Sequence, residues 1–293
     1  MEIIGFQIKK AGEKMIVHHA LPDAPFDYAP YAARHSGDQI SIYKSVQNEL
    51  LCLSYYFPQG HDAAQKRPAI LLIHGGGWSS RQIFPDQRAW AGDYLGYLAR
   101  YFADHGYVAV SMDYRLMHEG GQTPQYQLPD LVADCRDALD YVVLRAARMG
   151  IDPENISVLG ESAGGHLAGM LATDPNLPVP LRRAVLVNAI CDFALDPVWK
   201  SAVPQGSDAA ALSPACRVTA AMCPTVLIHG ENDRVVAPAQ AERMYLVLET
   251  HGVAADLHWI AQTDHAFLLA EYTDNLRACR EGIEILNRYF PAL

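Results

Sequence analysis

The sequence lacks the features that would direct the protein to a membrane or to nucleic acid. No apolar stretch approaches the ~20 residues that cross a bilayer. Basic residues are few, with 23 Lys and Arg against 33 Asp and Glu, so the formal net charge is −10. A surface this negative repels phosphate backbones and anionic lipids. We therefore expect neither nucleic acid nor a membrane as a partner, and a neutral or cationic small molecule as the substrate.

Paired cysteines and a secretion signal are also missing. The six cysteines are scattered along the chain, and none forms a Cys-x-x-Cys pair, which favours a reducing compartment over a disulfide scaffold or a zinc site. The first residues carry an early acid, Glu2, and lack the basic and apolar regions and the cleavage site of a signal peptide. We expect a cytoplasmic protein, although a secreted one whose signal had been removed would leave the same sequence.

From about residue 48 onward, short apolar runs alternate with longer amphipathic segments. Runs rich in Val, Ile and Leu predict strands over 69–73, 107–112, 156–159, 184–187 and 225–228, with an early strand over 51–57 and a weaker run over 257–260. Their length and their Gly, Pro and Asp boundaries are typical of a parallel sheet buried on both faces. Apolar residues at three- and four-residue steps predict helices over 91–105, 129–149, 238–251 and 275–289. The alternation predicts one α/β domain, residues 1–293, with helices on both faces of the sheet.

Two segments do not follow the alternation. Residues 1–45 are rich in proline and tyrosine and form an N-terminal extension, whose last part leads into extended strands over 38–57. Residues 191–222 contain three prolines and show no strong period. We interpret this second segment as a small cap insertion over the carboxyl edge of the sheet, where open α/β sheets bind ligands.

The pentapeptide Gly160-Glu161-Ser162-Ala163-Gly164 fits the G-x-S-x-G pattern of a nucleophile elbow. It follows one predicted strand and opens a helical pattern, the sharp turn that exposes a nucleophilic serine. The helix N-terminus also directs the backbone N–H of Ala163 toward a developing oxyanion. The alternative is a glycine-rich turn with a capping serine. The context favours Ser162 as the nucleophile.

A second glycine-rich segment, His74-Gly75-Gly76-Gly77-Trp78, follows an earlier predicted strand. Three glycines let the backbone approach a bound ester and direct N–H groups toward it. The segment lacks the Gly-Lys-Ser/Thr ending of a phosphate-binding loop. We predict an oxyanion hole formed by Gly76, Gly77 and Ala163, with His74 shaping the loop rather than acting as a base.

A serine nucleophile needs a base, and the base needs an acid that fixes its tautomer. Asp233 follows the strand predicted over 225–228, and His265 follows the last predicted strand, so the order is Ser-Asp-His. Glu231 is an alternative acid, and Asp264 could instead cap the next helix. The other histidines downstream of the elbow lie in predicted helices or strands or at their ends: His166, His229, His251 and His258.

These motifs together resemble the hormone-sensitive-lipase-like and acetyl-esterase branch of the α/β-hydrolases. The matching segments are 74–78, 113–116, 160–166, 230–233 and 264–267, and the resemblance covers about residues 65–290. It implies a mostly parallel, eight-stranded-type sheet flanked by helices, and a structural role for Asp113-Tyr114-Arg115 under the glycine loop. The N-terminal segment departs from the helical cap usual in the lipase branch, and this leaves the acyl pocket undefined.

The resemblance implies a serine carboxylesterase, or acetyl esterase, that hydrolyses short-chain acyl esters, including those of carbohydrates, and needs no metal or organic cofactor. Trp78 is the predicted substrate-binding residue, with Trp90 and Trp199 as further candidates for the pocket lining. An arylformamidase or peptidase using the same triad is the alternative enzyme, and a binding protein that lost turnover is the alternative outside catalysis. The expected partner is a small-molecule or oligosaccharide ester, and the sequence leaves a homo-oligomer open.

Overall fold

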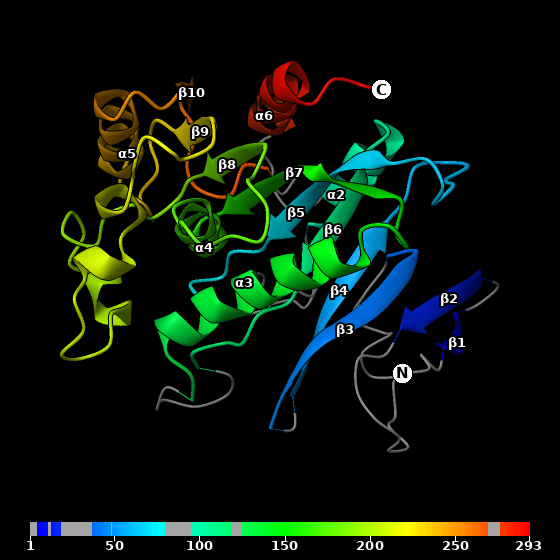
Figure 1. Cartoon of the computed structure of the whole chain (residues 1–293). Coiled ribbons are helices and arrows are strands. Elements are labelled where there is room, and N and C mark those ends of the chain that lie inside the picture. Colours follow the sequence, from blue (N-terminus) through cyan, green and yellow to red (C-terminus); the bar gives the residue numbers. More distant parts are fainter. Residues whose placement is uncertain are drawn as a thin grey trace.

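One continuous β-sheet organises the computed structural model (Figure 1), which describes residues 5–10, 13–18, 37–47, 49–79, 95–118, 125–268 and 276–293. Ten strands in these residues pair in the order β1-β2-β3-β4-β6-β5-β7-β8-β9-β10. Their bounds are β1 Gly5–Lys10, β2 Glu13–His18, β3 Gln39–Val46, β4 Glu49–Tyr56, β5 Arg67–Ile73, β6 Val108–Met112, β7 Ile151–Glu161, β8 Arg183–Val187, β9 Thr225–Gly230 and β10 Ala255–Ile260.

Most neighbouring strands in this sheet run parallel. All pairs from β6 to β10 are parallel, whereas β4 is antiparallel to both β3 and β6. The strands β3 to β10 therefore form the mostly parallel eight-stranded sheet that the resemblance implies. The antiparallel β1–β2 pair extends its edge next to β3. It was not predicted, because residues 1–45 carry no clear apolar period.

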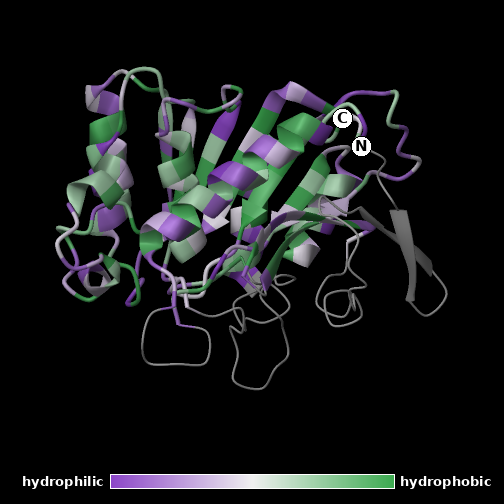
Figure 2. Ribbon diagram, turned by 60° about the horizontal axis from the view of Figure 1, so that its bottom comes forward, coloured by the Kyte–Doolittle hydropathy of each residue, from purple (hydrophilic) through white to green (hydrophobic). Residues whose placement is uncertain are grey.

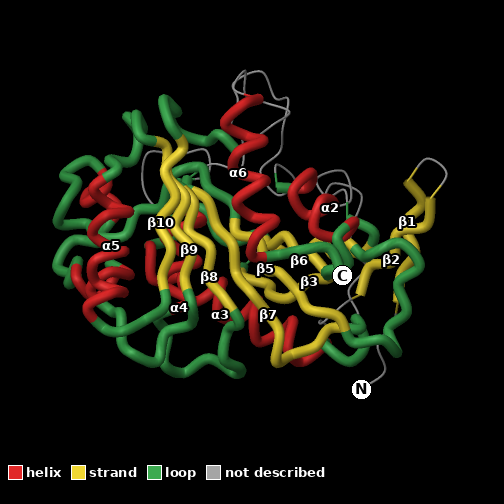
Figure 3. The backbone as a smooth tube through the Cα atoms, turned by 90° about the horizontal axis from the view of Figure 1, so that it is seen from above, coloured by secondary structure: helices red, strands yellow, loops and turns green. Residues whose placement is uncertain are grey.

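Five helices among the described residues cover the two faces of the sheet (Figure 3). They are α2 Gly96–Asp104, α3 Leu128–Arg145, α4 Ala163–Ala172, α5 Ala239–Thr250 and α6 Leu276–Tyr289. Residues alternate between the faces: in β5, Ile70 and Leu72 pack with α2 and α6, whereas Leu71 packs with α3, α4 and α5. Both faces are buried, so the central strands are mostly hydrophobic in Figure 2, as the continuous apolar runs predict.

The insertion 191–222 connects β8 to β9 and contains three short 3₁₀ helices, Trp199–Ala202, Ala210–Leu212 and Pro214–Cys216. Its irregular backbone agrees with the weak sequence period. In the described part of the chain, no helix is long and apolar enough to cross a membrane. The six cysteines all lie in that part, and no disulfide joins them.

Candidate active site

The elbow, residues 160–164, lies where β7 ends and α4 begins. Ser162 is the junction residue, with φ 57° and ψ −121°, a strained conformation for a residue with a side chain. Its N–H donates to the carbonyl of Val187 on β8 (2.8 Å). Only glycine fits two residues to either side of it: a Cβ at Gly160 would lie 2.1 Å from the Gly164 carbonyl oxygen, and one at Gly164 would lie 2.1 Å from the Ile73 oxygen.

The glycine loop after β5, residues 74–78, contains backbone with positive φ angles and is stabilised by contacts with Tyr114. Gly76, Gly77 and Trp78 have positive φ angles of 94°, 59° and 58°. The hydroxyl of Tyr114 donates to the carbonyls of His74 (2.8 Å) and Gly75 (3.0 Å), and its ring stacks on that of His74. His74 is buried, and its Nδ1 lies 2.8 Å from the Gly75 oxygen. These contacts fit the structural roles expected for His74 and Tyr114.

Three backbone N–H groups are available near this loop. Within the described residues, the N–H groups of Gly76, Gly77 and Ala163 have no hydrogen-bond acceptor. A helix N-terminus such as that of Ala163 leaves N–H groups unsatisfied, and such groups can stabilise a developing oxyanion. The predicted oxyanion residues are therefore free to donate to a ligand.

The predicted acid and base are in direct contact. His265 Nδ1 lies 2.7 Å from Asp233 Oδ2, and the aspartate side chain is fully buried. The other oxygen, Oδ1, accepts hydrogen bonds from the N–H groups of Val235 (2.9 Å) and Val236 (2.8 Å). Burial raises the pKa of Asp233, but hydrogen bonds from His229, His265 and the Val236 N–H outweigh it, and the pKa lies well below its usual range. Asp233 is thus a carboxylate that orients one imidazole nitrogen.

The alternative acid, Glu231, lies elsewhere. It is exposed, and its carboxylate accepts a hydrogen bond from the N–H of Gln262 (3.3 Å) rather than one from His265. Asp264, considered as a cap of the next helix, accepts from the N–H of His265 and pairs with the guanidinium of Arg234. Of these three carboxylates, only Asp233 contacts the imidazole ring of His265.

The acid–base pair and the elbow adjoin each other at the carboxyl ends of β7, β8 and β9. Glu161 pairs in register with Val187 of β8, which pairs with Ile228 of β9. The Glu161 side chain is buried, and both carboxylate oxygens lack a hydrogen-bond partner among the described residues. Burial raises its pKa to about 7; of the smaller effects, the charge of His265 lowers the pKa and that of Asp233 raises it. Glu161, the residue before Ser162, therefore interacts electrostatically with both His265 and Asp233.

Comparisons with known proteins agree with this arrangement. Residues 53–194 match the BD-FAE family model. The structure of esterase 2 from Thermogutta terrifontis with propionate bound superposes with a TM-score of 0.72 and 26% identity, covering 90% of this chain and 97% of that one. The match to the BD-FAE model spans just under half of the chain, and the fold is that of the α/β-hydrolases.

Curated relatives are longer than this α/β-hydrolase chain. The probable carboxylic ester hydrolase LipM of Mycobacterium tuberculosis is 27% identical over 235 residues, which are 70% of this chain and 51% of LipM. The non-reducing polyketide synthase trt4 of Aspergillus terreus is 31% identical over 195 residues, which are 64% of this chain and 8% of the synthase. The chain thus spans about half of one relative and less than a tenth of the other.

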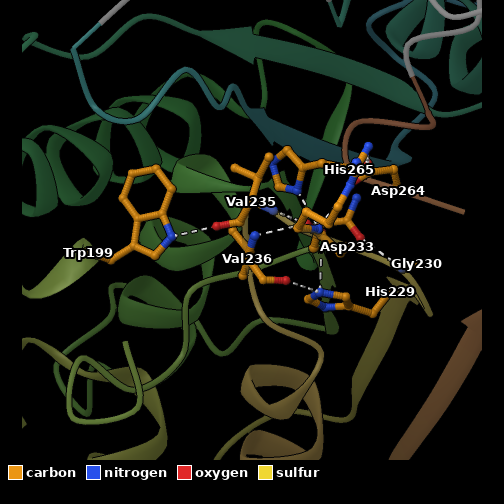
Figure 4. A network of polar contacts seen from close by, with 10 residues as sticks. Trp199, His229, Gly230, Asp233, Val235, Val236, Asp264 and His265 are labelled. Atoms are coloured by element: carbon orange, nitrogen blue, oxygen red, sulfur yellow. Dashed lines mark hydrogen bonds and ion pairs between the residues drawn. The ribbon is translucent and has the colours of Figure 1, made fainter. Parts of the chain in front are cut away.

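Aromatic side chains flank the glycine loop of this α/β-hydrolase. Trp78 is 1% exposed and packs against His166, Phe193 and Trp199, so its predicted contact with substrate stays a prediction. Trp199, from the insertion, is only partly buried, and its ring lies 3.8 Å from where a Cβ on Gly77 would be. Its indole N–H donates to the Val235 oxygen (2.9 Å; Figure 4). Trp90 lies outside the described residues.

Most of the other histidines contact backbone or remote groups. His166 Nε2 lies 2.8 Å from the Leu212 oxygen, and burial lowers the pKa of this ring to about 4. His251 Nδ1 lies 2.8 Å from the Val247 oxygen, and His258 Nε2 lies 2.7 Å from the Tyr289 hydroxyl.

Sequence reasoning missed three contacts around Asp233: that of His229 with Asp233, that of Trp199 with Val235, and the Arg234–Asp264 pair. The HG-x-x-D spacing of His229 and Asp233 was the available signal for the first. Within the described residues, no group of three or more His, Cys, Asp or Glu is arranged to hold a metal ion.

Proposed function

We propose that the protein is a carboxylic ester hydrolase that acts on short-chain acyl esters, chiefly acetyl esters and including those of carbohydrates. The observation that carries the proposal is the 2.7 Å contact between His265 and the buried Asp233, on the sheet edge where the strained elbow presents Ser162. A histidine oriented by a carboxylate is the base that a serine nucleophile requires.

The proposed cycle uses the chain's own groups. His265 Nε2 accepts the proton of Ser162 as Oγ attacks the ester carbonyl, and Asp233 stabilises the imidazolium through Nδ1–H. The N–H groups of Gly76, Gly77 and Ala163 bind the oxyanion. His265 then protonates the departing alcohol, which leaves the acyl group on Ser162. Water, deprotonated by His265, releases the acid and restores the serine.

Two observations support a short acyl group. The Trp199 ring stands beside Gly77, next to the proposed oxyanion site, so a long or branched acyl chain would meet it. The similar Thermogutta esterase 2 has propionate, a three-carbon acid, bound in its structure. The negative net charge of the chain also suits neutral esters better than anionic ones.

The test is a substrate series with Ser162→Ala as the inactive variant. We expect wild-type protein to hydrolyse p-nitrophenyl acetate and acetylated xylo-oligosaccharides, with rates that fall as the acyl chain lengthens. Ser162→Ala should lose activity on the order of 10⁶-fold. Ser207→Ala, which changes an exposed serine of the insertion, should retain full activity. Near-normal turnover in Ser162→Ala would exclude this nucleophile.

The same series separates the alternatives. Faster hydrolysis of N-formyl aromatic amides or of proline-containing dipeptides would assign the triad to an arylformamidase or a peptidase. Absence of turnover on every ester and amide, in protein shown to be folded, would favour a binding protein.

A further inference from the structure

Two histidines contact the same carboxylate oxygen of Asp233 (Figure 4). His265 Nδ1 lies 2.7 Å from Oδ2, and His229 Nε2 lies 3.3 Å from that atom. His229 is the penultimate residue of β9 and is 1% exposed, with its ring edge-on to Trp259. The proposed cycle gives this buried imidazole no role.

The contacts of His229 fix the position of its proton. Nε2 lies 3.0 Å from the carbonyl oxygen of Val236, which can only accept a hydrogen bond. Nε2 must therefore carry a hydrogen in either protonation state of the ring. That N–H is shared between the Val236 carbonyl and Asp233 Oδ2, so His229 is a donor to the carboxylate.

The hydrogen bonds of the Asp233 carboxylate then divide between its two oxygens. Oδ1 accepts two N–H groups of its own loop, those of Val235 and Val236. Oδ2 faces both imidazoles, with His265 Nδ1 at 2.7 Å and His229 Nε2 at 3.3 Å. Without His229, Oδ2 would be held only by His265, the group that must gain and lose a proton during turnover. The buried His229 N–H gives Oδ2 a partner that does not change during the reaction.

We propose that His229 is a positioning residue for the triad: its Nε2–H holds Asp233 Oδ2 toward His265 and limits the negative charge on that oxygen. The inference rests on the proposed esterase function. His229 also ties Asp233 to the Val236 carbonyl, and thereby links the carboxylate to the end of the acid loop, residues 230–236.

The test compares two substitutions of similar bulk. His229→Gln keeps an N–H donor at the position of Nε2, whereas His229→Phe keeps a buried ring and removes the donor. We expect His229→Phe to lower kcat for p-nitrophenyl acetate about tenfold, the usual effect of removing one hydrogen bond to a charged group, with KM unchanged. His229→Gln should stay within about threefold of wild type.

The pH profile distinguishes positioning from simple loss of structure. An Oδ2 with one donor fewer carries more negative charge and stabilises the His265 imidazolium more strongly. The acid limb of kcat/KM against pH should therefore move to higher pH in His229→Phe and return in His229→Gln. Equal losses in both variants that match the fraction of folded protein, with an unmoved acid limb, would overturn the proposal.

A spectroscopic readout keeps the inference separate from the esterase assignment. The downfield proton resonance of His265 Nδ1–H reports its hydrogen bond to Asp233 without any substrate. This resonance should shift in folded His229→Phe and recover in His229→Gln, even if the wild-type protein hydrolyses no ester. An unchanged resonance in folded His229→Phe would refute the positioning role, whereas inactive wild-type protein would refute only the proposed function.

Discussion

The elbow and the acid loop hold their functional side chains in different ways. In the elbow, backbone packs directly on backbone: there is no room for a Cβ at Gly160, which lies against the backbone of Gly164, or at Gly164, which lies against the end of β5. In the acid loop, polar atoms determine the geometry: the Gly230 N–H donates to Asn188 Oδ1 (3.1 Å), and the Asn232 N–H donates to the Thr263 oxygen (2.9 Å). Substitutions of the elbow glycines should therefore fail sterically, as should one at Gly230, whose Cβ would lie 2.5 Å from the Thr263 oxygen, whereas those of the polar residues after Gly230 should have graded effects.

The largest effect is expected for Gly164→Ala. The new Cβ would lie 2.1 Å from the Ile73 oxygen and 2.4 Å from the His74 oxygen, and both are backbone atoms that cannot move aside without shifting β5 or α4. We expect a loss of about 4 kcal/mol or more in the free energy of unfolding, together with activity. Denaturant unfolding followed by circular dichroism measures this loss.

Gly169→Ala is the matched control in the same helix. Its Cβ would meet two side-chain carbons of Pro214 at 3.0 Å, and alanine favours the helix by about 1 kcal/mol over glycine. A small change of either sign is expected. Equal destabilisation by the two substitutions would contradict the claim that backbone contact at Gly164 fixes the elbow.

A smaller, pH-dependent effect is expected for Glu161→Gln. Glu161 keeps its proton up to about pH 7 in the folded state, whereas the unfolded chain ionises near the ordinary value of 4.5. Stability is therefore lost as the pH rises from 4.5 to 7, and the penalty persists above 7. The difference between the two pKa values of Glu161, about 7 and 4.5, corresponds to about 3 kcal/mol in the free energy of unfolding. Glutamine would recover this stability at pH 8 and not at pH 4. Thermal unfolding at both pH values measures this difference. A gain of equal size at both would show that the Glu161 charge does not destabilise the elbow.

The smallest effect is expected for Arg234→Ala, which removes the ion pair between the acid loop and Asp264. The guanidinium makes two contacts with Asp264 Oδ2 (2.7 and 2.5 Å), but the arginine side chain is 86% exposed. Solvent screens such a pair, so the stability change should stay within about 1 kcal/mol and the loss in kcat/KM within about threefold. Denaturant unfolding measures the stability change, and steady-state kinetics in low and high salt measures the loss in kcat/KM. A tenfold loss would mean that this exposed pair, rather than the buried contacts, holds Asp233.

The same contrast explains what could be predicted from the sequence. The strands β4 to β9 were recognisable because burial on both faces demands continuous apolar runs, whereas the half-buried β10 gave a weaker run. The elbow was recognisable because sterics demand glycine at 160 and 164. The hydrogen-bond partners of the acid loop could not be predicted, because hydrogen bonds between remote segments produce no periodic pattern in the sequence. Trp199 reaches Val235 across 36 positions, and Arg234 reaches Asp264 across 30. The β1–β2 pair at the sheet edge was not predicted, because residues 1–45 show no clear apolar period.

The central claim is that Ser162 is an activated nucleophile, and covalent labelling tests it most directly. Wild-type protein would be treated with a fluorophosphonate probe and analysed by intact mass and by peptide mapping. The account predicts one adduct per chain, located on Ser162, and none in Ser162→Ala. Folded wild-type protein that takes no label, or an adduct that persists in Ser162→Ala, would contradict it.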